Sequence, residues 1–143
     1  MAPRDFSEAD DPLTYRIIGC AIAVHRELGP GLLESVYDEC MGNALTKAGL
    51  SFRRKPRIRI PYEGSVLDKE YRPDFVVADQ VVVEVKSVAH FLPVHQAQTL
   101  TYMKLSRIRR GLLINFNVAM LVKGIKRLVM TEAPTGASAE IVL

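Results

Sequence analysis

The most informative part of the sequence for the fold is Arg72-Pro73-Asp74-Phe75-Val76-Val77-Ala78-Asp79-Gln80-Val81-Val82-Val83-Glu84-Val85-Lys86. Two runs of valine-rich, β-forming residues flank a short polar turn at 78–80, which is typical of a hairpin. Because side chains alternate along a strand, Glu84 and Lys86 are expected on one face. A hairpin that turns at 78–80 can bring Asp74 beside Glu84 or Lys86, since antiparallel partners lie about 4.5 to 5.5 Å apart. The stretch therefore predicts two carboxylates and an ammonium group at one point of a sheet.

The two neighbouring carboxylates predict a metal site. Carboxylates at this spacing repel when both are ionised, so a protein interior tends to retain them where a cation neutralises the pair. Oxygen ligands of this kind suit Mg²⁺ or Mn²⁺. A metal held by Asp74 and Glu84 would polarise a phosphate oxygen and lower the pKa of a bound water, while Lys86 would orient that water or offset charge on the phosphorane. The expected chemistry is phosphodiester hydrolysis.

Helical and strand periodicities surround this hairpin. The predicted helices cover residues 13–28, 32–48 and 94–106. The predicted strands cover residues 52–62, 66–71, 75–77, 81–88, 111–115 and 125–130, with a turn or short helix at 117–124. The strands between residues 52 and 88 are expected to form a meander. This order of elements predicts an α/β (α+β) fold in which helices flank a central mixed β-sheet.

The composition indicates one globular domain. The chain has 143 residues, of which 48% are hydrophobic and 24% are charged, and this balance is ordinary for a globular protein. We expect the domain to cover residues 13–130, with tails at 1–12 and 131–143. No run of 18 apolar residues occurs, and the acidic first twelve residues are unlike a signal peptide. With Cys20 and Cys40 expected to be reduced thiols, the prediction is a cytoplasmic protein without membrane contact.

Positive charge is concentrated in two places, although the formal net charge is only +3. The first is a stripe that alternation places on one face of the strand at 52–62: Arg53, Lys55, Arg57 and Arg59. The second follows the third predicted helix: Lys104, Arg107, Arg109 and Arg110. Both groups suit contact with the phosphates of a nucleic acid. The stripe equally suits a solvated strand face that protects a sheet edge from aggregation.

The residues of the hairpin resemble the signature of the PD-(D/E)XK nuclease superfamily. Pro73-Asp74 followed by Glu84-x-Lys86 matches that signature, and Gln98-xxx-Tyr102 matches the QxxxY motif of its exonuclease-like branches. The stretch Gly31-Leu32-Leu33-Glu34-Ser35-Val36-Tyr37, preceded by His25-xx-Leu28-Gly29-Pro30-Gly31, is similar to the GxxExxY family of proteins.

This resemblance covers residues 13–130 and implies a restriction-endonuclease-like core with Mg²⁺- or Mn²⁺-dependent cleavage of nucleic acid, DNA being favoured over RNA. In the superfamily a glutamate on an early core helix commonly joins the metal site, and by position this residue is Glu34. The implied metal ligands are therefore Asp74, Glu84 and Glu34, and Lys86 completes the catalytic set. Gln98 and Tyr102, four residues apart on one side of a helix, are expected to position the substrate.

Each of these features also has a purely structural explanation. The helix dipole favours a glutamate such as Glu34 at a helix N-terminus, and Gln98 and Tyr102 suit an exposed amide and a ring at the edge of the core. A catalytically silent nucleic-acid-binding module and a protein-interaction module on the same fold therefore stay open. A homodimer also stays open, because the apolar strand at 125–130 could pair with the edge of a second copy.

Overall fold

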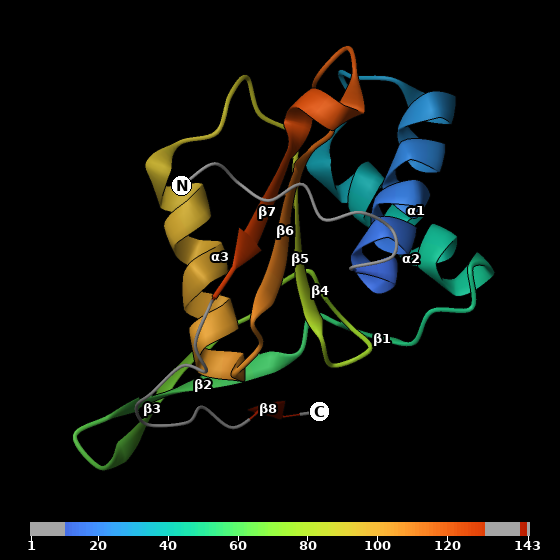
Figure 1. The fold of residues 1–143 in the computed structure, drawn as a ribbon. Coiled ribbons are helices and arrows are strands. Elements are labelled where there is room, and N and C mark those ends of the chain that lie inside the picture. The colour runs from blue at the N-terminus through green and yellow to red at the C-terminus, as the bar shows by residue number, and fades with distance from the viewer. Residues whose placement is uncertain (1–10, 131–140, 143) are drawn as a thin grey trace.

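The computed structural model describes residues 11–130 and 141–142, which form helices on both faces of a central β-sheet (Figure 1). The helices are α1 (Pro12–Leu28), α2 (Glu34–Lys47) and α3 (Pro93–Ser106), and a short 3-10 helix, η1 (Leu121–Gly124), precedes the strand β7. The strands are β1 (Phe52–Arg54), β2 (Arg57–Tyr62), β3 (Ser65–Tyr71), β4 (Phe75–Val77), β5 (Val81–Lys86), β6 (Arg110–Asn115), β7 (Ile125–Val129) and β8 (Ile141–Val142). The predicted α/β architecture with a helix-flanked mixed sheet is confirmed.

The central sheet has five strands in the order β1-β4-β5-β6-β7. Strands β5 and β6 are parallel, and the other neighbours are antiparallel. A parallel pair needs a crossover connection, and α3 supplies it between the end of β5 and the start of β6. Strands β4 and β5 therefore lie inside the sheet, where neighbouring strands fix their positions. Glu84 belongs to β5, and Asp74 directly precedes β4.

Alternation along β4 and β5 divides the core between two helical layers. Val83 and Val85 face α1 and α2, together with Phe75 of β4. Val76 and Val82 point the other way and pack against α3. Glu84 follows Val82 by two residues on β5, so its side chain is expected on the same face, which α3 covers.

The prediction of a single strand over residues 52–62, and of one continuous meander, is wrong. β1 pairs with β4 in the central sheet, whereas β2 belongs to a second sheet with the order β3-β2-β8. The chain leaves the central sheet at Lys55, whose backbone is left-handed with φ of 49°, and at Pro56, which has no backbone N–H for a ladder. The regular alternation of residues 52–62 concealed this break.

Helix α3 approaches the sheet closely at Gly111 of β6. A Cβ atom at this position would lie 2.5 Å from Sδ of Met103 and 3.3 Å from Cγ2 of Thr99, both on α3. The glycine therefore sets the distance between α3 and the sheet.

Among the described residues, no helix combines the length and the apolar character that crossing a membrane requires. Cys20 and Cys40 are both free thiols; Cys20 is buried and Cys40 is partly exposed.

Candidate active site

The β4–β5 hairpin places Asp74 opposite Glu84. The register pairs Phe75 with Val83 and Val77 with Val81, and one further step along both strands reaches Asp74 and Glu84. The turn between the strands has a hydrogen bond from Gln80 N to Val77 O, and its central residues Ala78 and Asp79 have φ of 51° and 55°. Left-handed residues of this kind suit the twist of a tight hairpin and fix its register.

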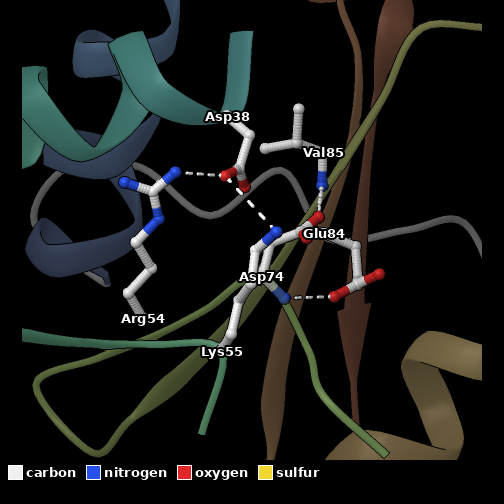
Figure 2. Close-up of polar contacts among 6 residues, drawn as sticks. All are labelled: Asp38, Arg54, Lys55, Asp74, Glu84 and Val85. Atoms are coloured by element: carbon white, nitrogen blue, oxygen red, sulfur yellow. Dashed lines mark hydrogen bonds and ion pairs between the residues drawn. The ribbon is translucent and has the colours of Figure 1, made fainter. Parts of the chain in front are cut away.

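Each acidic side chain accepts a hydrogen bond from the backbone of the facing arm of the hairpin (Figure 2). The backbone N–H of Asp74 donates to Oε1 of Glu84 at 2.7 Å, and the N–H of Val85 donates to Oδ2 of Asp74 at 2.7 Å. Within the part of the chain that the structure describes, Oδ1 of Asp74 and Oε2 of Glu84 accept no hydrogen bond. The hairpin therefore fixes both carboxylates and leaves one oxygen of each available to a ligand.

Burial makes the negative charges of this pair costly. The pKa of Glu84 is raised to about 8, first by burial and then by the neighbouring charge of Asp74, against the effect of the hydrogen bond from Asp74 N. The pKa of Asp74 is raised to about 6, chiefly by burial, although the hydrogen bond from Val85 opposes the shift. Two carboxylates with raised pKa values and only oxygen donors fit a hard divalent cation such as Mg²⁺, which would neutralise both. We call Asp74 and Glu84 the acidic pair.

Lys86 lies on the same face of β5 as Glu84, one strand repeat further on, and is partly exposed. Its positive charge lowers the pKa of both members of the acidic pair. The backbone around it is held from β6, because Phe116 N donates to Lys86 O at 2.9 Å. The ammonium group thus lies within electrostatic range of the acidic pair, and its catalytic role stays a prediction.

Glu34 lies in the first turn of α2 and is exposed. Its charge raises the pKa of both Asp74 and Glu84, which shows that it lies within electrostatic range of the acidic pair. The described residues nevertheless contain no group of three or more His, Cys, Asp and Glu side chains that is arranged to hold a metal ion. The role of Glu34 as a third ligand stays a prediction.

The loop before Glu34 is held by Tyr37. Its hydroxyl donates to Gly29 O at 2.5 Å and accepts from Leu32 N at 3.1 Å, and its ring stacks on Phe116 with centroids 4.7 Å apart. Gly31 within this loop has φ of 97°, which favours glycine. The glycine and tyrosine of the Gly31-to-Tyr37 motif therefore shape the loop that presents Glu34.

A further acidic residue near the site, Asp38, was not predicted from the sequence. It lies one turn after Glu34 on α2 and is 4% exposed. Its Oδ2 accepts from Arg54 Nη2 at 2.6 Å and lies 3.8 Å from Lys55 Nζ, whereas its buried Oδ1 has no hydrogen-bond partner in the described chain. Its charge also raises the pKa of Asp74. The spacing of four residues from Glu34 was the available signal, because it places both acids on one side of α2.

Tyr102 of α3 borders the acidic pair from the other side. It is 8% exposed, and its ring packs edge-on against Tyr71 with centroids 5.6 Å apart. Its pKa is raised to about 12, first by burial and then by the charges of Glu84 and Asp74. Gln98 lies one turn earlier on α3 and is partly exposed. The structure thus brings Tyr102 to the acidic pair, and the substrate-positioning role of both residues stays a prediction.

The predicted cationic stripe is divided between two sheets. Arg53 of β1 forms an ion pair with Asp79 at 3.3 Å, and Arg57 of β2 with Glu70 at 3.5 Å. Lys55, at the break between the strands, lies near Asp38, and Arg59 on β2 is exposed. Of the four cations, only Lys55 approaches a residue whose charge acts on the acidic pair. Contact of the four with nucleic acid stays a prediction.

Comparison with known proteins adds one finding. The model of a family described as the PD-(D/E)XK nuclease superfamily matches residues 11–128. Neither the curated proteins nor the solved structures gave a match. The matched segment contains the acidic pair, Lys86 and every helix of the structure.

Proposed function

The chain belongs to the PD-(D/E)XK nuclease superfamily, and from this premise we propose that it is a Mg²⁺- or Mn²⁺-dependent nuclease that hydrolyses phosphodiester bonds of DNA or RNA, DNA being favoured. One observation above all supports the proposal. Asp74 and Glu84 are fixed side by side with raised pKa values, and Lys86 follows on the same face of β5. A divalent cation would offset the cost of keeping these two charges together.

The residues of the site have complementary roles in this proposal. Asp74 and Glu84 hold the cation through oxygens, with Glu34 of α2 as the third ligand. When bound, the cation supplies Lewis acidity toward a phosphate oxygen and a water of lowered pKa. Lys86 orients the attacking water or offsets the negative charge that develops on the phosphate. Gln98 and Tyr102 position the nucleic acid on the α3 side.

We also propose that residues 13–130 act as one domain and that the chain belongs to the GxxExxY branch of the superfamily. The hydroxyl bonds of Tyr37 to Gly29 and Leu32, with the left-handed backbone of Gly31, give that motif a structural purpose. A cytoplasmic location would agree with the two free thiols. A homodimer through the edge strand β7 would agree with the exposure of Val129.

The second candidate is a module that binds nucleic acid or an acidic protein without cleavage. The observation that favours it is the exposure of Arg57 and Arg59 on β2, outside the central sheet. Such a surface would bind phosphates through charge alone, and its affinity would fall steeply with salt.

The deciding experiment is a cleavage assay on single- and double-stranded DNA and RNA with Mg²⁺, Mn²⁺ or EDTA. Asp74→Ala and Lys86→Ala are compared with wild type, and the control is Asp79→Asn, an exposed position on the turn of the same hairpin whose left-handed backbone asparagine tolerates. We expect metal-dependent product from wild type and the control, and a loss of about 10²-fold or more in both site variants.

Product that persists in EDTA or in both site variants would point to a contaminating nuclease and contradict the proposal. Salt-dependent binding without any product in Mg²⁺ or Mn²⁺ would favour the silent binding module. Failure to bind any nucleic acid at low salt would favour the protein-interaction module.

A further inference from the structure

The backbone at Lys55 is strained, and the strain lies next to the acidic pair. Lys55 has φ of 49° and precedes Pro56, so it adopts a left-handed conformation at a position where proline restricts the preceding residue to extended conformations. The surrounding structure holds it there, because Lys55 N donates to Asp74 O at 2.9 Å. Such strain is commonly retained where it places a side chain for function.

The side chain of Lys55 is directed by a buried carboxylate (Figure 2). Asp38 is 4% exposed, and its Oδ2 lies 3.8 Å from Lys55 Nζ. The same oxygen accepts a much closer contact, 2.6 Å, from Arg54 Nη2. The guanidinium of Arg54 also lies 5.9 Å from the ring centre of Phe75, although 44% of the Arg54 side chain is exposed. Arg54 therefore neutralises the charge of Asp38 and links α2 to β1.

Lys55 adds a second positive charge beside Asp38, whose single negative charge Arg54 already neutralises. One carboxylate faces two cations, and the ammonium is the more distant of the two, with 49% of its side chain exposed. An ammonium group has three donors, so a single long contact leaves room for an anion. By contrast, Arg53 and Arg57 face the surface carboxylates of Asp79 and Glu70.

We propose that Lys55 binds a substrate phosphate on the β1 side of the acidic pair, and that Asp38 is the positioning residue that holds its ammonium there. The identity of the anion, a nucleic-acid phosphate, rests on the proposed function. The site would thus have cations on two sides of the acidic pair: Lys86 on β5 and Lys55 at the end of β1. In this arrangement Arg53, Arg57 and Arg59 do not contact the phosphate at the acidic pair.

The test is the salt dependence of oligonucleotide binding, measured by fluorescence anisotropy in EDTA, where neither metal nor cleavage contributes. The full chain is compared with Lys55→Met and with Lys47→Met, an exposed lysine at the end of α2 that lies about 20 Å along the helix from Glu34. Lys55→Met should weaken binding roughly five- to tenfold and reduce the slope of log K against log salt by about 0.7 to 0.9. Lys47→Met should match wild type, and Lys55→Arg should restore most of the slope.

A double-mutant cycle tests the positioning role of Asp38. Asp38→Asn should weaken binding in the wild-type background and have little further effect in Lys55→Met, whereas a general loss of structure would act equally in both. If Asp38→Asn does not fold, Lys55→Met and Lys55→Arg still decide the phosphate contact. An unchanged slope in Lys55→Met, or an equal loss in Lys47→Met, would overturn the inference.

The result is separable from the test of nuclease activity. A reduced slope in Lys55→Met, together with no metal-dependent product from wild type, would support the phosphate contact and reject the nuclease. Metal-dependent product with an unchanged slope in Lys55→Met would reject this inference alone.

Discussion

Among the single residues of the acidic pair, Glu84 is the one whose pKa is raised more. Its pKa of about 8 lies above its ordinary value of 4.5, so the folded chain binds a proton that the unfolded chain has lost between these two values. Stability therefore falls as pH rises through this window, because the folded state binds more protons than the unfolded state. Asp74, with a pKa of about 6, adds to the effect over the lower part of the window.

We predict that the metal-free protein is less stable at pH 8.5 than at pH 5, on the order of a few kcal/mol. Glu84→Gln should remove most of this difference, since the amide keeps an oxygen for Asp74 N and carries no charge. The measurement is urea unfolding at both pH values in EDTA, with Asp79→Asn as an exposed control. Equal stability of the wild type at the two pH values would show that Glu84 ionises as in water.

Tyr102 gives a second prediction at this scale. Burial and the charges of the acidic pair keep its hydroxyl protonated up to about pH 12, so it can donate to a substrate oxygen at neutral pH. Tyr102→Phe should lower cleavage by about tenfold or more, and should change the free energy of unfolding by less than about 1 kcal/mol. Steady-state cleavage and urea unfolding test this, with Tyr15→Phe on α1 as control. A stability loss that accounts for the lost activity would assign Tyr102 a structural role.

Among the elements, helix α3 packs closely against strand β6 at Gly111, where there is no side chain. We predict that Gly111→Ala destabilises the fold by about 1 to 3 kcal/mol, because its Cβ would meet Met103 and Thr99 and displace α3. Met103→Ala should cost less in the Gly111→Ala background than in wild type, since the smaller side chain makes room for the new methyl group. Additive effects in urea unfolding would contradict the close approach of α3 to β6.

Local patterns in the sequence were sufficient for the hairpin and the helices. The strand patterns at 75–77 and 81–88 predicted that Glu84 and Lys86 share a face and that Asp74 lies beside Glu84 or Lys86; the register of the short hairpin pairs it with Glu84. Alternation at residues 52–62 led to the wrong prediction of a single strand, because Lys55 and Pro56 direct the chain into a second sheet. Period-two patterns reveal facing along a strand, but not which sheet the strand joins.

In the molecule as a whole, the proposed site is formed by three elements that are distant in sequence. The hairpin contributes the acidic pair, α2 contributes Glu34 and Asp38, and α3 contributes Tyr102. Motif spacing predicted Glu34 and Tyr102 through a family resemblance. Asp38 was not predicted, because its position depends on contacts between α2 and the end of β1. Arg54 and Lys55 make these contacts, and no local sequence pattern encodes them.

Binding of a divalent cation by the acidic pair can be measured by calorimetric titration of the protein with Mn²⁺ at pH 7. We predict saturable binding with release of about one proton, detected as a dependence of the heat on the ionisation enthalpy of the buffer, because the cation replaces the proton on Glu84. Binding should be lost in Asp74→Asn and retained in Asp79→Asn. Absence of saturable binding, or equal binding by wild type and Asp74→Asn, would contradict the account.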